Sequence, residues 1–318
     1  MPNASLDEKP VPWPQFARVI RDTRAGVRRV LAQMIAARTN APRTLATLAF
    51  LPLAAFSTSL EAHAAGLLDA RYTLTVAGVE LGRAAVTVRA SDSAYEVSGV
   101  GRITGALRAV SSGKGQIAAR GALNGSKMIP RVYAMHAESE GKKERARLAM
   151  VSGAVTNEDV HPPLRPLPDR VPVVERVLRN IMDPVSGAFI YLPGTGSLIS
   201  PEACDRTIPV YDGRQRYDLR LSYARQETVE TKGYSGPAVV CQVRYIPVAG
   251  HRPNRYTVQY MVDNEDMYVW LAPIEGTRLL APFKVSVATL IGTATLDATS
   301  FKAKEISSAP ENAARKKR

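Results

Sequence analysis

The sequence is poor in cysteine, in aromatic residues and in long apolar runs. Two cysteines among 318 residues exclude a disulfide-dense miniprotein, and the 6% aromatic content argues against the aromatic girdles of an outer-membrane barrel. One apolar run, from Leu45 to Phe56, contains Pro52 and is shorter than the ~20 residues that a membrane-spanning helix needs. With 45% apolar residues the chain can still bury a core, so we expect one or two domains that do not span a membrane.

The apolar run belongs to a pattern that is typical of a cleaved secretory signal peptide. Arg38 and Arg43 precede the run, and the small-residue motif Ala62-His63-Ala64 follows it. We therefore expect cleavage between Ala64 and Ala65 and export to the periplasm. No cysteine stands at this site to receive an acyl chain, so the mature protein is not expected to be a lipoprotein.

Three parts of the chain follow from this pattern. Residues 1–64 are an N-terminal extension and signal peptide, in which Met34 is the expected start because the charged region before a signal is normally short. Residues 65–304 form the mature domain, and residues 305–318 are expected to be a disordered basic tail. Cleavage removes eight basic and four acidic residues, which lowers the net charge from +13 to +9. An exported, mildly basic chain is not expected to bind nucleic acid.

Strands dominate the predicted secondary structure of the mature domain. From Asp69 onward, apolar residues recur with a period of two, and Asn124-Gly125 is typical of a tight hairpin. We predict a mainly β fold: a single curled antiparallel sheet, forming an open or half barrel, with one or two short helices. Strands are expected over most of 69–160 and over 207–212, 216–223, 238–246, 256–263, 267–272, 278–288 and 292–301.

A proline-rich segment separates two groups of predicted strands. Five prolines between His161 and Pro172 exclude regular structure there, so this segment is expected to cross between the two halves. Asp183-Pro184 then has the residue types of a helix start, with the aspartate as N-cap and the proline at the first helical position. This pattern predicts a short helix over 185–191.

The two cysteines, Cys204 and Cys241, both lie in the mature domain. Thiols of an exported protein meet an oxidising compartment, so a structural disulfide between them is the simplest interpretation. Closing this loop stabilises a domain by roughly 3.9 kcal/mol in the chain-entropy account. A zinc site needs about four ligands, and a redox pair normally has the C-x-x-C spacing, so both alternatives fit less well.

Catalytic and metal-binding patterns are scarce. The mature chain has three histidines, His136, His161 and His251, and contains no G-x-S-x-G or H-E-x-x-H motif. The best enzyme candidate pairs His251 with Asp212 or Asp183, because a histidine oriented by a carboxylate is the minimum for general-base catalysis. Nothing in the spacing brings these residues together. We therefore expect no catalytic residue, no metal and no cofactor, and keep a periplasmic hydrolase as the alternative.

An ordered set of short motifs resembles the family of unknown function DUF3108, in its alphaproteobacterial branch. The resemblance extends over residues 68–302 and implies an exported envelope protein with a curled sheet similar to the periplasmic lipoprotein carriers. It implies no known activity and no catalytic residues. The motifs are Asp183-Pro184-Val185-Ser186, Cys204, residues 209–214 (PVYDGR), Arg216-Tyr217, Tyr234-x-Gly236, Cys241, residues 247–252 (PVAGHR) and residues 270–273 (WLAP).

Three functional classes follow from these features. The first is a non-enzymatic periplasmic protein that supports the cell envelope and binds a lipid chain, a peptide or an envelope protein on the concave face of the sheet. The second is the hydrolase that would use His251. The third, an outer-membrane barrel, is disfavoured by the low aromatic content and the proline-rich crossing.

Overall fold

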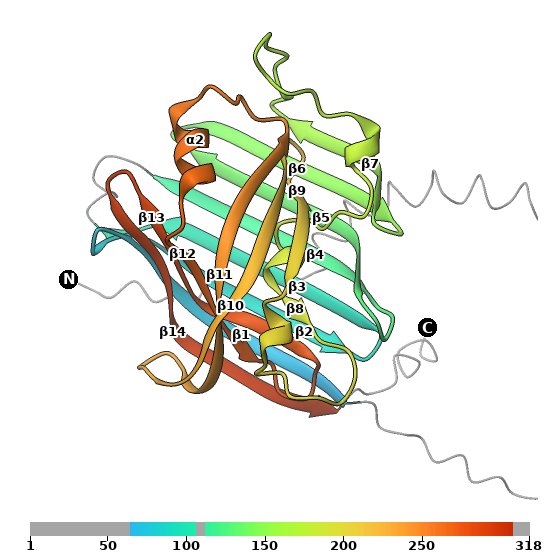
Figure 1. Cartoon of the computed structure of the whole chain (residues 1–318), viewed down its shortest axis with the longest axis vertical. Helices are drawn as coiled ribbons and strands as arrows, with labels where there is room; N and C mark the ends of the chain where they lie inside the picture. Colours follow the sequence, from blue (N-terminus) through green and yellow to red (C-terminus); the bar gives the residue numbers. More distant parts are fainter. Residues whose placement is uncertain (1–63, 106–111, 308–318) are drawn as a thin grey trace, which may run out of the picture. The chain divides into compact units, whose positions relative to one another are not determined.

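The period-two alternation forms a 14-stranded antiparallel sheet in the computed structural model, which describes residues 64–105 and 112–307 (Figure 1). The hydrogen-bonded strand order is β7-β6-β5-β4-β3-β2-β1-β14-β13-β12-β11-β10-β9, and β8 pairs with β13. The strands are β1 (Ala64–Val76), β2 (Val79–Ser91), β3 (Ala94–Ile103), β4 (Gly113–Leu123), β5 (Met128–Ser139), β6 (Lys142–Val151), β7 (Ala154–His161), β8 (Ile190–Tyr191), β9 (Arg206–Tyr211), β10 (Arg216–Glu230), β11 (Ser235–Ala249), β12 (Met267–Pro273), β13 (Leu279–Thr289) and β14 (Gly292–Ser307). The predicted fold class is therefore confirmed.

Tight turns connect several neighbouring strands of the first half. The turns Ala77-Gly78, Glu140-Gly141 and Ser152-Gly153 have positive φ at both residues, which is the geometry that matches the twist of antiparallel strands. At the Asn124-Gly125 turn, the Asn124 side-chain oxygen accepts hydrogen bonds from the amides of Ser126 (3.2 Å) and Lys127 (3.0 Å). Local turn chemistry thus explains how this half folds into a meander.

β1 and β14, the first and last strands in the sequence, pair with each other, and this pairing joins the two halves of the sheet. Ala64 lies opposite Ser307, and Ala65 lies opposite Ile306. Because β14 continues to Ser307, residues 305–307 belong to the sheet. The prediction of a disordered tail from 305 was therefore wrong for its first three residues, and the remainder of that segment lies outside the described residues.

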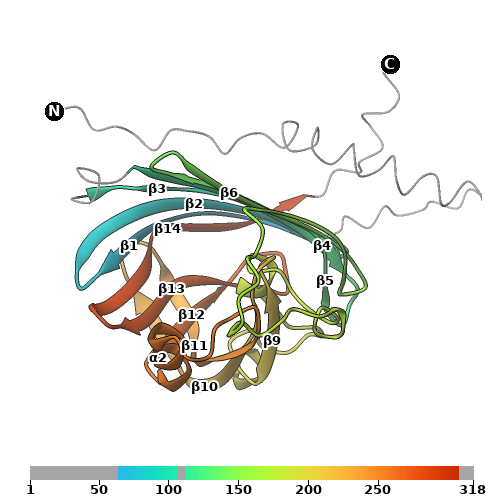
Figure 2. The same cartoon turned by 90° about the horizontal axis from the view of Figure 1, so that it is seen from above.

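The sheet curls so that β10 and β11 lie opposite β2 and β3 (Figure 2). Its two edge strands, β7 and β9, do not pair with each other. A short stretch of chain, residues 178–182, lies between them and is here called the seam segment. On one side, the amide of Val155 donates to Leu178 O (3.2 Å) and the amide of Ile181 donates to Gly153 O (3.0 Å). On the other side, Met182 pairs with β9.

The contacts between Met182 and β9 are also backbone hydrogen bonds. The Met182 amide donates to Pro209 O at 2.7 Å, and the Tyr211 amide donates to Met182 O at 2.9 Å. Both sheet edges therefore receive backbone hydrogen bonds from one irregular segment, which satisfies polar groups that an open edge would leave free.

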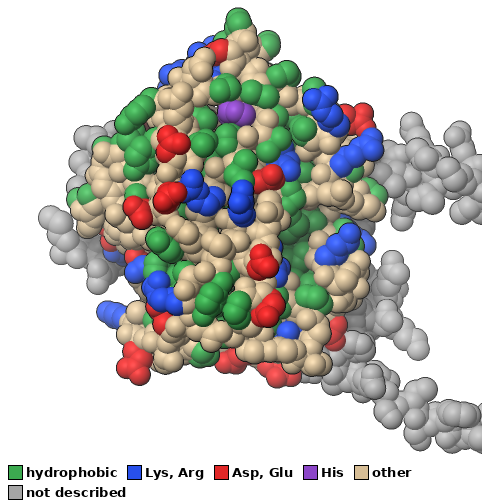
Figure 3. Space-filling view, in the orientation of Figure 1, with side chains coloured by type: hydrophobic (Ala, Val, Ile, Leu, Met, Phe, Trp, Pro, Cys, Tyr) green, Lys and Arg blue, Asp and Glu red, His purple; other side chains and the backbone are tan. Residues whose placement is uncertain are grey.

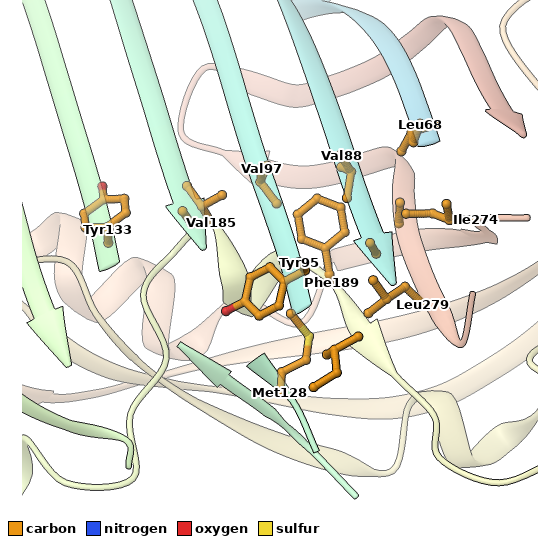
Figure 4. Close-up of a cluster of buried hydrophobic side chains, with 14 of the residues drawn as sticks. Leu68, Val88, Tyr95, Val97, Met128, Tyr133, Val185, Phe189, Ile274 and Leu279 are labelled. Atoms are coloured by element: carbon orange, nitrogen blue, oxygen red, sulfur yellow. The ribbon is translucent and has the colours of Figure 1, made fainter. Parts of the chain in front are cut away.

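Side chains of the connecting chain cover part of the concave face. Val88, Tyr95 and Val97 of the first half pack with Val185 and Phe189 of the connecting chain in one buried cluster (Figure 4). Each of these side chains is less than 9% exposed. Burying an apolar side chain of this size stabilises the fold by about 1.5–3 kcal/mol, so this connection is part of the core.

The helix predicted over 185–191 was wrong. The structure has a single 3-10 turn, η3 (Ser186–Ala188), followed directly by β8. The cap itself forms as expected, because Asp183 Oδ1 accepts hydrogen bonds from the amides of Val185 (3.0 Å) and Ser186 (2.9 Å). The helix ends after one turn because Phe189 enters the core and Ile190 pairs with β13, two tertiary contacts that outweigh a weak local propensity.

The strand predicted over 256–263 was also wrong, because these residues form helix α2 (Tyr256–Asp263). β11 and β12 pair directly with each other through Val239–Gln242, so the sheet has no position for another strand between them. The helix instead packs beside β11, where Arg244 Nη2 donates to Val262 O at 3.4 Å. Within the described part of the chain, no helix is long and apolar enough to cross a membrane.

The predicted disulfide is present. Cys204 and Cys241 are joined, both are fully buried, and 37 positions separate them in the sequence. The bond attaches the segment after η4 (Pro201–Ala203) to the middle of β11. The disulfide therefore holds the connecting chain against the second half of the sheet. A third 3-10 turn, η2 (Glu175–Val177), lies before the seam segment.

Candidate functional site

A groove of 580 Å³ lies at the seam, lined by the beginning of β5, the seam segment and β9. Figure 3 shows recessed apolar side chains beside basic side chains on the face of the molecule seen in Figure 1. The β4–β5 turn and the β6–β7 turn contribute to one wall, β9 contributes to the other, and the seam segment and β8 lie between them. Its floor is formed by five apolar side chains that are each less than 9% exposed: Met128, Ile181, Phe189, Ile190 and Ile208.

Residues from both faces of β9 line the groove, because Arg206, Thr207, Ile208 and Pro209 all belong to its lining. Ile208 and Val210 are buried against the layer that contains the disulfide, whereas Tyr211 belongs to the cluster inside the first half. Because side chains alternate between the two faces of a strand, Thr207 and Pro209 share the face of Tyr211. Both residues line the groove, and Thr207 is exposed.

Two basic side chains line the groove, Lys127 and Arg206. Lys127 is exposed and is positioned by the Asn124 turn. Arg206 is half-buried, and its guanidinium donates from Nη1 to Tyr191 O (3.3 Å) and from Nη2 to Glu202 O (2.7 Å). Burial lowers the pKa of Arg206, and the charge of Asp205 opposes this shift, but a guanidinium stays protonated in proteins.

A buried polar cluster follows the seam segment. Asp183 is fully buried, and its burial raises the pKa of the carboxyl group to about 6. Its Oδ1 atom caps the turn, whereas its Oδ2 atom has no hydrogen-bond partner among the described residues. Ser186 contacts the Tyr95 hydroxyl at 2.7 Å, which ties the cluster to β3. The geometry is that of a structural cap inside the core.

The structure does not bring His251 together with either predicted carboxylate. Asp183 caps its own turn, and Asp212 Oδ1 accepts hydrogen bonds from the amides of Arg214 and Gln215, both at 2.7 Å. Within the described residues, neither carboxylate forms a hydrogen bond or an ion pair with His251, whose Nδ1 atom is buried without a partner. Burial lowers the pKa of His251.

The PVAGHR and DGR motifs instead hold the proline-rich crossing against the sheet. The guanidinium of Arg170 donates to Gly250 O at 2.6 Å, and Arg252 forms an ion pair with Asp169 at 2.7 Å. Gly250 has φ +81°, and a Cβ atom there would lie 2.0 Å from Arg214 O, so only glycine fits this contact. These motifs have a structural role that their sequence pattern did not indicate.

Two other predictions concern metals and signal cleavage. No group of three or more histidine, cysteine, aspartate or glutamate side chains able to hold a metal occurs in residues 64–105 and 112–307. The apolar run of the signal peptide lies outside the described residues. Ala64 and Ala65 open β1, and cleavage between them stays a prediction.

Sequence reasoning missed the groove. Its lining comes from segments between Asn124 and Pro209 that meet only through the curl of the sheet. The one local signal was the Asn124-Gly125 turn, which was predicted and which holds Lys127 at the groove. Nothing in the sequence indicated that Arg206 would line the same groove.

Comparison with known proteins identifies the family. No curated protein matches the chain. A solved structure described as a beta-barrel-like protein of the domain of unknown function DUF1849, from Brucella abortus, is similar with 8% identity and a TM-score of 0.43, and the similarity covers 76% of this chain and 98% of that one. The family model described as a protein of unknown function (DUF3108) matches residues 71–299, so the chain belongs to the DUF3108 family.

Proposed function

We propose that the mature chain is a non-enzymatic periplasmic protein of the cell envelope that binds an acyl chain in the seam groove. The observation that carries the proposal is the groove itself, a 580 Å³ opening with a floor of buried apolar side chains. Sites for small ligands usually have volumes of about 300–1,000 Å³, a mainly apolar lining and a few polar groups.

The proposed ligand site differs from the site that was expected from the sequence. The concave face was expected to be the binding surface, but Val185 and Phe189 pack against part of it. A ligand at that part would have to displace core side chains, each of which contributes about 1.5–3 kcal/mol to folding. The seam groove needs no such displacement.

The expected compartment agrees with the covalent structure. A fully buried disulfide is typical of proteins that fold in an oxidising space such as the periplasm. The signal-peptide pattern that ends at Ala64 supports export independently.

A hydrolase based on His251 is the weaker candidate. General-base catalysis needs a histidine that is oriented by a partner and can reach the substrate, and the His251 ring has neither carboxylate beside it. No observation of the described residues favours this alternative over binding.

The test is to block the groove. The full chain is expressed in a Gram-negative host, purified from the periplasm, and examined by mass spectrometry for co-purified lipid and by titration with radiolabelled palmitate and hexadecanol. Thr207→Trp places an indole in the groove at an exposed strand position. Thr228→Trp, at an exposed position of β10 that does not line the groove, is the matched control.

We expect Thr207→Trp to weaken binding of both probes at least about tenfold and Thr228→Trp to change it less than twofold. Absence of binding by the unmodified protein would overturn the proposal. Equal binding by the two tryptophan variants would also overturn it, because the ligand would then lie elsewhere.

A further inference from the structure

We infer that the ligand of the seam groove is an amphiphile with an anionic end, held by Arg206 and Lys127. This inference rests on the proposed function, since it assigns the polar end of a ligand whose apolar chain lies on the groove floor. The shared chemistry is a long acyl chain that ends in a carboxylate or a phosphate.

Arg206 is the main anchor for an anion because its guanidinium is half-buried and forms no ion pair with the described residues. None of the ion pairs of the described residues includes Arg206. Its hydrogen-bond partners are two backbone carbonyls, Tyr191 O and Glu202 O, and its Nε atom is buried without a partner among the described residues. A desolvated cation is costly unless a counter-charge is present, and a bound anion would supply one.

Lys127 supplies a second cation to the same groove. It also has no ion-pair partner among the described residues, and its backbone is fixed by the Asn124 turn. Among the described residues, no aspartate or glutamate lines the groove. The nearest acidic influence on Arg206 is Asp205, whose side chain is exposed and does not line the opening. The lining therefore has two positive charges and no negative charge.

The two components of the groove select one class of ligand. The apolar floor favours a hydrocarbon chain, and the two cations favour an anion over a neutral or cationic end. A guanidinium suits both carboxylate and phosphate because its N–H groups match two acceptor oxygens. An alcohol of the same chain length would satisfy the floor and leave both cations without a counter-charge.

The experiment compares three probes of equal chain length: palmitate, 1-palmitoyl lysophosphatidate and hexadecanol. Each is titrated against the purified full chain and against the variants Lys127→Gln, Arg206→Gln and Arg206→Lys. Lys232→Gln removes one exposed positive charge from a residue that does not line the groove, and it is the matched control. Circular dichroism checks that each variant keeps the strand spectrum.

We expect both anions to bind at least about tenfold more tightly than hexadecanol, because a hydrogen bond to a charged group contributes more than a neutral one. Arg206→Gln should weaken anion binding about tenfold or more, Lys127→Gln about three- to tenfold, and Lys232→Gln less than twofold. Arg206→Lys should fall between the wild type and Arg206→Gln. The preferred anion distinguishes a fatty-acid carboxylate from a lipid phosphate.

Equal binding of the alcohol and the anions would overturn the inference. So would anion affinities that Lys127→Gln and Arg206→Lys reduce no more than Lys232→Gln does, and these two variants keep the test valid if Arg206→Gln does not fold. If hexadecanol and palmitate bind equally and Thr207→Trp abolishes both, the groove still binds a chain and only the anionic end is wrong. If no probe binds, the proposed function fails as well.

Discussion

The first seven strands of the sheet and the last seven are held together in different ways. In the first half, tight turns such as Ala77-Gly78 place several strands beside the previous one. In the second half, short turns also join β9 to β10, β10 to β11 and β13 to β14. Two long connections remain: the chain between β7 and β9, which the disulfide attaches to β11, and the segment between β11 and β12, which contains α2. Local turn chemistry therefore accounts for the short connections of both halves, whereas the two long connections of the second half depend on contacts between residues that are distant in sequence.

The connecting chain between the halves limits how much of the concave face is open to a ligand. Phe189 fills space inside the first half, and the seam segment binds both sheet edges through its backbone. A curled sheet with an empty interior would offer a wide ligand site. In this sheet, Val185 and Phe189 of its own chain cover part of the concave face, and one groove among the described residues lies at the seam.

Among the variants that test this comparison, Phe189→Ala should have the largest effect on the free energy of unfolding. The side chain is 7% exposed and packs in the cluster of the first half. Its removal leaves a cavity and should lower the free energy of unfolding by about 3–5 kcal/mol. Urea denaturation followed by tryptophan fluorescence measures this change. A loss below about 1 kcal/mol would show that the connecting chain is not part of the core.

Loss of the disulfide should have the next largest effect. Replacing Cys204 or Cys241 by serine should lower the free energy of unfolding by about 2–4 kcal/mol, because the unfolded chain gains loop freedom. The second half should lose amide-exchange protection before the first half does, since the first half has no such bond within its described residues. Equal loss of protection in both halves would contradict the comparison.

Asp183 should give a smaller, pH-dependent effect. Its pKa is raised to about 6 by burial, above the ordinary value of 3.8, so the folded state binds a proton more tightly than the unfolded state. This group's contribution to stability is fully present below about pH 4, is lost as the pH rises through about 6, and amounts to about 3 kcal/mol at most.

The measurement is the difference in the free energy of unfolding between the wild type and Asp183→Asn across pH 4–7. Any constant cost of the asparagine cancels in the slope, and the difference should shift in favour of the asparagine variant as the pH rises. Asp205→Asn, which changes an exposed carboxyl group, should give a much flatter difference. A flat line for Asp183→Asn would show that its carboxyl group is not desolvated in the folded protein.

Much of the sheet could be predicted because the relevant signals are local. Alternation around Leu219 and Leu221 gave a correct strand, and the Asn124-Gly125 turn was placed correctly. The disulfide could be predicted because the chain offers only one pairing. Alternation failed at 256–263, where a short apolar run fits a helix as well as a strand and the direct pairing of β11 with β12 decides.

The sequence alone thus determined the strand periodicity, several turns and the covalent link, since each depends on residues near one another or on cysteine number. Only the tertiary structure decided that Val185 and Phe189 pack against the first half, that the PVAGHR motif supports the crossing, and that Lys127 and Arg206 line one groove. The two basic residues are far apart along the chain. Both line the groove because strand register, the curl of the sheet and the seam segment place the β4–β5 turn and β9 at the same opening, and no local pattern encodes that arrangement.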